Sequence, residues 1–232
     1  MEAVPAQALA CGTWPPPDVL GVRGYSGKRP WWVRQPMTAM TKTELRRLAR
    51  TRRKQFVADR GSALFPAHVP HMSELLALLS PQICVAGYCA MASEADISEL
   101  LTDLKGRGSA LALPWIGAQG QDMLFRSWSD AATLDMAADK FLQPLSTADQ
   151  VVPDIVLIPL LGFDRQGSRL GQGAGYYDRA LAQQSEPLRI GVAWSVQEFE
   201  NLPADPWDMP LDAILTEAEW IIPETSRCAK ER

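Results

Sequence analysis

The chain has 232 residues, of which 47% are hydrophobic and 22% are charged, and its formal net charge is -4. This composition is typical of a globular protein with a full core, and it excludes a disordered or fibrous chain. Because the charge balance is slightly negative, the overall charge does not imply binding of nucleic acid or of an anionic membrane. Any positive site must be local.

The four cysteines, Cys11, Cys84, Cys89 and Cys228, form neither a CxxC pair nor a disulfide-rich pattern, which favours a reducing compartment. No apolar run approaches the roughly 20 residues that a membrane span needs. The first residues, MEAVPAQALACG, lack the basic start of a secretory signal. We therefore expect a cytoplasmic protein that is not bound to a membrane.

Residues 1–36 are rich in proline and tryptophan and show neither a helical nor a strand period. We expect an irregular N-terminal extension over residues 1–39, one domain over 40–221 and a C-terminal tail over 222–232. Two alternatives for the extension stay open. Translation begins at Met37 or Met40, just before a strong helix start, or the extension docks through its tryptophans or acts as a targeting segment.

The first clear element is a helix over residues 41–56, TKTELRRLARTRRKQF. Thr41 and Glu44 have the spacing of a capping box, and Leu45 begins an apolar stripe. The other face is basic and carries Lys42, Arg46, Arg47, Arg50, Arg53 and Lys54. A solvated face is one interpretation. The other is that Lys42 and Arg46, four residues apart in the first turns, converge on a phosphate or carboxylate.

Helices and apolar strands alternate along the rest of the chain. We expect helices over residues 71–79, 96–108 and from 176 onward, and strands over residues 82–88, 109–114, 122–128, 154–161, 188–194 and 211–216. Continuous apolar strands separated by helices predict an α/β fold with a mainly parallel sheet and helices on both faces. In such sheets the site lies beyond the carboxyl ends of the strands.

A glycine-rich segment, GFDRQGSRLGQGAGYYDRAL, occupies residues 162–181, between the most apolar strand and a helix. Gly171, Gly173 and Gly175 allow positive φ and let backbone N–H groups approach a ligand. A phosphate cradle is the natural use, strengthened by the helix start and by the charge of Arg169. The segment is neither a Walker A loop nor a GxGxxG dinucleotide motif. Asp178 suits either a first helical turn or a magnesium site beside a phosphate.

These residues carry a resemblance. FDRQGSRLGQGAGYYDRAL resembles the signature FDxxGxRLGxGxGYYDxxL of 5-formyltetrahydrofolate cyclo-ligases, also called methenyltetrahydrofolate synthetases. The likeness extends to the KxxLR pattern of Lys42, Leu45 and Arg46, to residues 88–94, to Met123 and to the DxxxDxxxT pattern of DMPLDAILT. It covers residues 40–217, which is most of the chain.

The resemblance implies a sugar-isomerase and CoA-transferase-like α/β fold and a reaction. ATP, Mg²⁺ and 5-formyltetrahydrofolate give 5,10-methenyltetrahydrofolate, ADP and phosphate, by phosphorylation of the formyl oxygen and attack of N10 on the activated carbon. Such chemistry needs positioning and charge stabilisation more than a protein nucleophile. The lack of a Ser/His/Asp set agrees with this, since His68 and His71 flank a proline-bounded loop. We expect a monomer or weak homodimer.

The resemblance also implies a role for each matched residue. The expected nucleotide-binding residues are Lys42, Arg46, Arg169, Leu170, Gly171, Gln172, Gly173, Ala174, Gly175, Tyr176 and Tyr177. Arg169 and Tyr177 are also the expected catalytic residues. The expected folate contacts are Cys89, Glu94, Gly173 and Tyr176, and the expected Mg²⁺ ligands are Asp178 and Asp208. For Tyr176 and Tyr177, packing of the helix start onto the sheet is an open alternative.

This chain departs from the family pattern in its loop. Many members read RLGRGKGYYD, whereas this chain has Gln172 and Ala174. Losing one charge-assisted phosphate contact costs about 1.5 to 3 kcal/mol, roughly tenfold to a hundredfold in affinity. Trp207, beside Asp208, is a bulky residue that we expect to narrow the site.

Three rival functions follow. One is a binding or regulatory paralogue without turnover, which the neutral loop positions favour. Another is a phosphosugar isomerase or CoA-transfer enzyme, which needs a catalytic carboxylate and no magnesium. The last is nucleic-acid binding through the basic helix, which the lack of interleaved aromatic residues disfavours.

Overall fold

The computed structural model describes residues 40–66, 72–77, 83–117, 122–129, 134–137, 141–183, 187–224 and 226. The chain divides into two units, residues 1–36 and residues 37–232, and every described residue belongs to the second. The expected extension over residues 1–39 and the two histidines lie outside the described residues. The division of the chain into extension, domain and tail therefore stays a prediction.

The predicted helices are confirmed where the structure describes them. The helical segments are α1 (Lys42–Arg60), α2 (Met72–Ala77), α3 (Ser98–Gly106), α4 (Tyr176–Ala182) and the short 3₁₀ segment η4 (Ser195–Gln197). Ile97, directly before α3, is buried, and so are the helix residues Leu100, Leu101 and Leu104. None of these helices, within the described residues, is long and apolar enough to cross a membrane.

The central sheet is mainly parallel, as predicted. In spatial order its strands are β12 (Trp220–Ile221), β11 (Ala213–Leu215), β10 (Leu188–Val192), β7 (Ile155–Pro159), β1 (Cys84–Ala86), β2 (Ala110–Trp115), β3 (Leu124–Trp128) and β6 (Gln150–Val151). The five strands from β11 to β2 are parallel to their neighbours, whereas β12, β3 and β6 pair antiparallel at the two edges. Two small hairpins complete the fold: β4 (Leu134–Met136) with β5 (Leu142–Pro144), and β8 (Gly162–Phe163) with β9 (Arg169–Leu170).

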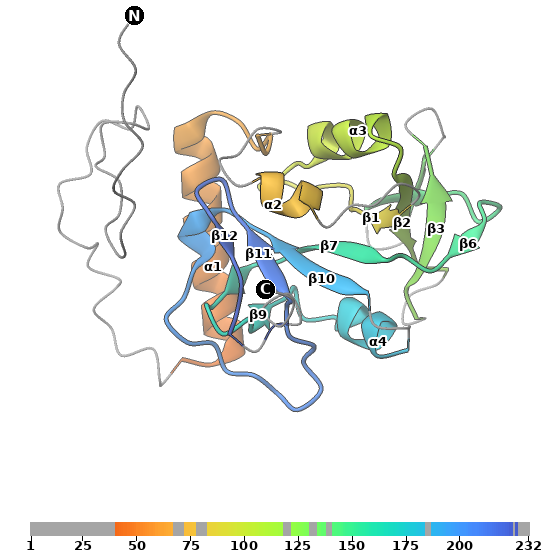
Figure 1. Cartoon of the computed structure of the whole chain (residues 1–232). Coiled ribbons are helices and arrows are strands. Elements are labelled where there is room, and N and C mark those ends of the chain that lie inside the picture. The colour runs from red at the N-terminus through yellow and green to blue at the C-terminus, as the bar shows by residue number, and fades with distance from the viewer. Residues whose placement is uncertain are drawn as a thin grey trace, which may run out of the picture. The chain divides into compact units, whose positions relative to one another are not determined.

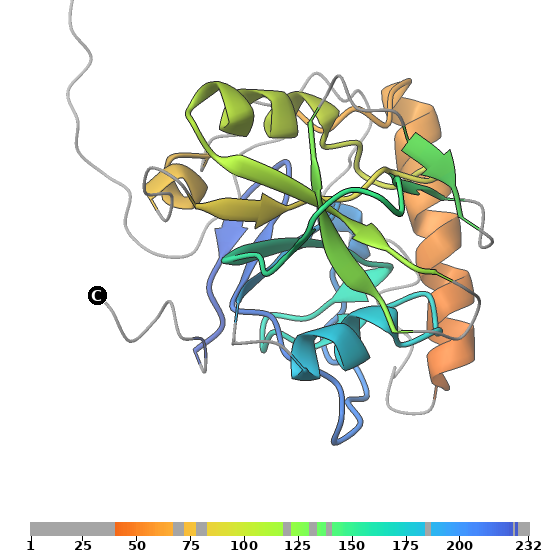
Figure 2. The ribbon, with the colours of Figure 1, turned by 90° about the vertical axis from the view of Figure 1, so that its right-hand side faces the viewer.

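Helices cover both faces of the sheet (Figure 1 and Figure 2). On one face, Ile155 and Leu157 of β7 pack in a cluster that contains the buried leucines of α2 and α3. On the other face, Val156 and Ile158 pack in a cluster with residues of α4. Neighbouring residues of one strand thus serve opposite cores, which explains why the strand is apolar without alternation.

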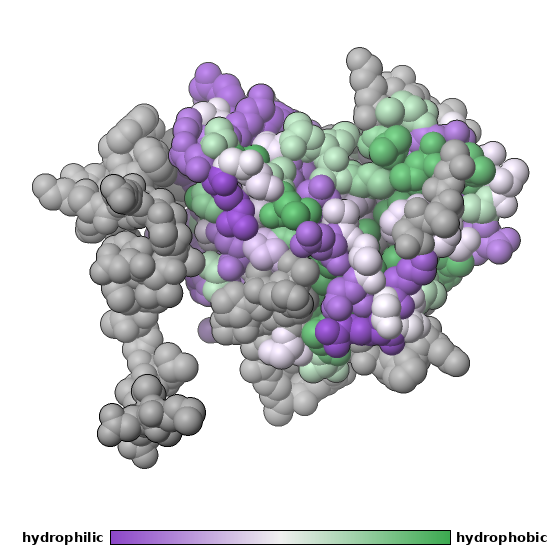
Figure 3. Space-filling view, turned by 90° about the horizontal axis from the view of Figure 1, so that it is seen from above, coloured by the Kyte–Doolittle hydropathy of each residue, from purple (hydrophilic) through white to green (hydrophobic). Residues whose placement is uncertain are grey.

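The described surface is mixed in character. Seen from above, hydrophilic residues gather at the upper left and at the lower centre, and hydrophobic residues gather mainly at the upper right (Figure 3).

Helix α1 lies beyond the carboxyl end of β7. Its side chains Leu45 and Ala49 are buried against Leu161 and Leu170, which follow β7 in the chain. The helix begins with the predicted capping box, in which the hydroxyl of Thr41 accepts from the Glu44 N–H and the Glu44 carboxylate accepts from the Thr41 N–H. It ends at Gly61, which has the left-handed φ of 75°.

We expect Thr41→Ala to lower the free energy of unfolding by about 1 kcal/mol, because it removes the N-terminal cap. Urea denaturation followed by circular dichroism measures this change. Thr43→Ala, at an exposed position inside the first turn, is the matched control and is expected to stay within about 0.5 kcal/mol of the wild type. Equal losses in the two variants would contradict a capping role.

Candidate functional site

A cavity of about 940 Å³ opens beyond the carboxyl ends of β1, β2 and β7. Every residue to which the sequence analysis gave a site role lines it: Lys42, Arg46, Cys89, Glu94, Arg169, Leu170, Gly171, Gln172, Gly173, Ala174, Gly175, Tyr176, Tyr177, Asp178 and Asp208. Lining residues without a predicted role include Tyr88, Met91, Arg179 and Asp205. Four segments that are distant in sequence therefore meet in one cavity.

The basic face of α1 is not simply solvated. Lys42, Arg46 and Arg50 follow one another at four-residue spacing, and each contacts another part of the site. The Nζ of Lys42 donates to Asp205 and Asp208, the Nε of Arg46 donates to the Gly171 carbonyl at 3.0 Å, and an Nη of Arg50 donates to Gln172 at 2.9 Å. Lys42 and Arg46 both line the cavity, and their convergence on a phosphate stays a prediction.

The glycine loop takes backbone conformations that only glycine adopts readily. Gly173 has φ 113°, and Gly175 has φ 68° and caps α4. Gly171 is not among the residues with positive φ, and no atom lies within 4 Å of the place where its Cβ would stand. Glycine is therefore required by the backbone at two of the three positions that the sequence suggested.

Arg169 is the most buried cation of the glycine-rich segment, with a side chain only 5% exposed. One guanidinium nitrogen donates to Asp178 Oδ1 at 2.5 Å, and another donates to the Met209 carbonyl. Burial lowers the pKa of Arg169, and the nearby carboxylates of Asp178 and Asp208 oppose this change. An arginine remains charged through such a change. The guanidinium is thus a fixed positive charge at the cavity wall.

The predicted metal ligands lie at the same end of the cavity. The Met209 N–H donates to Asp178 Oδ1 at 3.2 Å, which holds the segment after Asp208 against the start of α4. Asp208 Oδ2 accepts from Lys42 at 2.6 Å and from the Asp205 N–H at 2.8 Å. The sequence analysis missed Asp205, whose Oδ2 lies 2.7 Å from the same Lys42 nitrogen. The sequence signal that could have indicated Asp205 is its position three residues before Asp208.

The donor set suits magnesium held together with a nucleotide. Among the described residues, no group of three or more His, Cys, Asp or Glu side chains is arranged to hold a metal. Asp178 and Asp208 each use one oxygen in the hydrogen bonds given above, so one oxygen of each remains for a cation. Mg²⁺ is commonly held by one or two carboxylates, with phosphate oxygens and water completing its shell.

Trp207 lines the opening of the cavity and is 70% exposed. Its effect on the width of the site stays a prediction.

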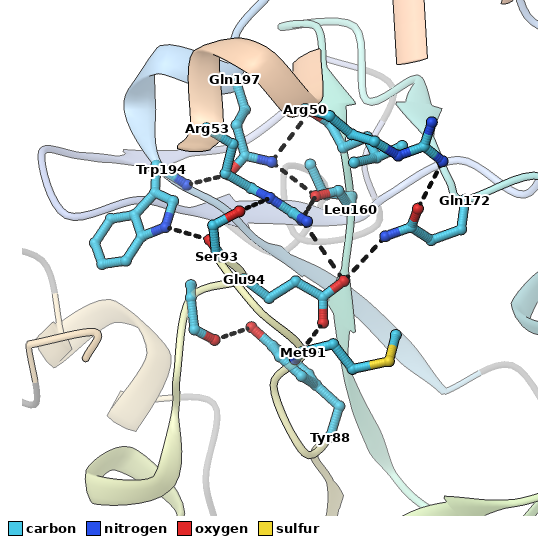
Figure 4. Close-up of polar contacts among 12 residues, drawn as sticks. Arg50, Arg53, Tyr88, Met91, Ser93, Glu94, Leu160, Gln172, Trp194 and Gln197 are labelled. Atoms are coloured by element: carbon cyan, nitrogen blue, oxygen red, sulfur yellow. Dashed lines mark hydrogen bonds and ion pairs between the residues drawn. The ribbon is translucent and has the colours of Figure 1, made fainter. Parts of the chain in front are cut away.

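Glu94 is a buried carboxylate in the lining of the cavity, 4% exposed (Figure 4). Its Oε1 lies 3.6 Å from an Nη of Arg53 and accepts from the Gln172 amide at 3.1 Å, while its Oε2 accepts from the Met91 N–H at 3.0 Å. Arg53 also donates to the Ser93 hydroxyl and to the Leu160 carbonyl. Burial lowers the pKa of Arg53, and the charge of Glu94 opposes this.

The two tyrosines both line the cavity and pack against the core around α4. The two interpretations left open for them are therefore compatible. Burial, followed by the charge of Glu94, raises the pKa of Tyr177, so its phenol stays neutral and can donate a hydrogen bond. Burial also raises the pKa of the Cys89 thiol, which disfavours a nucleophilic thiolate there.

The fold and this cavity together define an α/β enzyme whose site is built from a glycine loop, a row of cations and paired carboxylates. The sequence model of the 5-formyltetrahydrofolate cyclo-ligase family matches residues 38–217. The chain therefore belongs to that family.

Individual proteins similar to this chain carry the same family name. The 5-formyltetrahydrofolate cyclo-ligase of Escherichia coli K12 is 32% identical over 146 residues, which cover 59% of this chain and 80% of the relative. That of Haemophilus influenzae is 42% identical over 79 residues, or 32% of this chain and 42% of the relative.

Solved structures show the same fold. The 5,10-methenyltetrahydrofolate synthetase of Aquifex aeolicus has a TM-score of 0.54 and 29% identity, covering 81% of this chain and 87% of its own. That of Mycoplasma pneumoniae has a TM-score of 0.57 and 26% identity, covering 77% of this chain and 99% of its own.

We expect Lys42→Met to raise the pKa of Asp208. Desolvation alone raises that pKa, but the hydrogen bond from Lys42, the Asp205 N–H and the Lys42 charge outweigh it, so the pKa lies below the ordinary 3.8. The ion pair therefore stabilises the fold above the ordinary pKa, and this contribution is lost as pH falls through the lower, folded value. Carbon-13 NMR titration of the carboxyl groups measures the change.

Lys54→Met on the same helix is the control for this titration, because Lys54 is exposed. It is expected to leave the Asp208 titration where it is in the wild type. An unchanged Asp208 pKa in Lys42→Met would contradict the ion pair.

Proposed function

We propose that this protein uses ATP and Mg²⁺ to convert 5-formyltetrahydrofolate to 5,10-methenyltetrahydrofolate, with release of ADP and phosphate. The single observation that carries the proposal is that one cavity is lined both by the glycine loop with its cations and by the pocket of Glu94 and Tyr177. Such a cavity suits two substrates that react with each other directly. Membership of the cyclo-ligase family supports the same reaction.

The reaction needs an activated formyl oxygen. In the first step this oxygen attacks the γ-phosphorus of ATP, the bond from that phosphorus to the β–γ bridging oxygen breaks, and ADP leaves. In the second step the lone pair of N10 attacks the formyl carbon, the carbon–oxygen bond breaks, and phosphate leaves with both electrons of that bond. The N10 proton is lost to the surroundings, and the ring closes.

We assign phosphate binding to Lys42, Arg46 and Arg169, together with the N–H groups of the glycine loop. Phosphoryl transfer is accelerated mainly by positioning and by stabilisation of charge on the phosphoryl oxygens. Arg169 suits this task because its hydrogen bonds to Asp178 and to the Met209 carbonyl fix its direction. A fixed cation needs little reorganisation when charge develops in the transition state.

We assign magnesium to Asp178 and Asp208. When bound, Mg²⁺ neutralises charge on the phosphates. The carboxylate of Asp208 is already paired with a cation, since the Nζ of Lys42 lies 2.6 Å from its Oδ2. The two carboxylates Asp205 and Asp208 use two of the three N–H donors of Lys42, so the third can serve a phosphate.

We assign Glu94 to the folate substrate. A buried carboxylate accepts hydrogen bonds from the N–H groups of a pterin edge, and such buried bonds discriminate strongly between substrates. Tyr177, as a neutral phenol, donates near the same place, and Tyr176 offers a ring for stacking. The formyl group then lies between this pocket and the loop that holds the ATP.

A second candidate is a folate- or nucleotide-binding paralogue without turnover. It is favoured by the two neutral loop residues, Gln172 and Ala174, where many members have cations. Retention of Lys42, Arg46 and Arg169 in the same cavity speaks against it. The cytoplasmic location, the monomeric or weakly dimeric state and the lack of nucleic-acid binding remain predictions.

The deciding measurement is the near-ultraviolet absorbance of methenyltetrahydrofolate after 5-formyltetrahydrofolate, Mg²⁺ and ATP are mixed with the full chain. We expect a rise that depends on both ATP and Mg²⁺. Binding of 5-formyltetrahydrofolate without any rise would establish the paralogue instead.

We expect Asp178→Asn to raise the Mg²⁺ concentration needed for half-maximal rate by about tenfold or more, since losing a charge-assisted contact costs roughly 1.5 to 3 kcal/mol. Asparagine can still accept from Arg169 and from the Met209 N–H, so the melting temperature is expected to change little. Asp135→Asn, exposed on β4, is the control. A wild-type magnesium dependence in Asp178→Asn would remove Asp178 from the metal site.

A further inference from the structure

Gln172 joins the glycine loop to two other parts of the site (Figure 4). Its Oε1 accepts from an Nη of Arg50 on α1 at 2.9 Å, and its Nε2 donates to Oε1 of Glu94 at 3.1 Å. The partners lie 122 and 78 residues away in the chain. Gln172 thus links the loop assigned to phosphates with the carboxylate assigned to folate.

The direction of the amide is fixed by the charges on either side. Only a carbonyl oxygen suits the guanidinium of Arg50, and only the NH₂ group suits the carboxylate of Glu94. A cation at this position would face Arg50 unfavourably, and a carboxylate would face Glu94 unfavourably. A neutral amide is the side chain that satisfies both neighbours at once.

Glu94 depends on few donors. It is buried, and Oε1 has Arg53 at 3.6 Å on the interior side and Gln172 at 3.1 Å on the side of the loop. Oε2 is held separately by the Met91 N–H. Without the amide, Oε1 is free to turn toward Arg53 and away from the cavity.

We propose that Gln172 is a positioning residue for the folate substrate, which it serves by holding the Glu94 carboxylate in the direction that accepts the pterin N–H groups. The inference rests on the proposed function. The inference also explains why this chain has a glutamine where many family members have a cation. The glutamine orients the Glu94 carboxylate without placing a second cation against Arg50.

The test compares Gln172→Ala and Gln172→Glu in calorimetric binding of 5-formyltetrahydrofolate to the full chain, without nucleotide. Alanine removes both hydrogen bonds, whereas glutamate keeps an acceptor for Arg50 but repels Glu94. We expect the dissociation constant to rise about threefold to tenfold in Gln172→Ala, because the hydrogen bond to Glu94 is the one of the two that affects folate binding, and to rise further in Gln172→Glu. The control is Gln183→Ala, which removes an exposed amide that donates to Asp122 at 3.2 Å, and we expect wild-type binding.

The order of the folate dissociation constants distinguishes a role of Gln172 in positioning Glu94 from a role only in holding the loop against α1. If Gln172 only tied the loop to α1, glutamate would strengthen the bond to Arg50 and would bind folate as well as the wild type, which would overturn the proposal. Unchanged binding in Gln172→Ala would overturn it too. If the wild type and the two variants show the expected order of folate affinities but the wild type forms no product, that result would contradict the proposed function alone.

Discussion

Arg53 and Glu94 are 5% and 4% exposed, so two opposite charges are held away from water where three parts of the molecule meet. Burying two ions is costly unless hydrogen bonds replace the lost water. Here the Ser93 hydroxyl and the Leu160 carbonyl serve Arg53, while the Met91 N–H and the Gln172 amide serve Glu94. The pair therefore fixes α1, the segment after β1 and the end of β7 relative to one another.

Two further cations of the cavity form ion pairs of the same kind. Lys42 pairs with Asp205 and Asp208, and Arg169 pairs with Asp178. Lys42 and Arg169, two cations of the cavity lining, are thus each matched by a carboxylate of the protein. A chain with a net charge of -4 can in this way concentrate positive charge in one place without leaving cations unpaired when they are buried.

Much of the fold could be predicted because its signals are local. The capping box of Thr41 gave the start of α1, and continuous apolar runs gave the central strands. The unpredicted strands, such as β8 and β9, are two residues long, which is too short to show a periodic pattern.

The site residues could be predicted because a long sequence motif marks most of them, and the fold brings them together in one cavity. Arg53 was placed on the basic face, although it follows Leu45 and Ala49 at four-residue spacing, and that spacing marks the buried stripe. The contacts of Gln172 depend on distant segments, which no local pattern reveals.

Lys42 and Asp208 are separated by 166 residues, yet they lie within one hydrogen bond of each other. The cavity therefore takes its wall from both ends of the described domain. During synthesis on the ribosome, the first helix emerges long before the carboxylates that complete the wall. A nascent chain that has not reached Asp208 lacks this part of the wall, so the cavity is complete only when translation of the described domain is nearly finished.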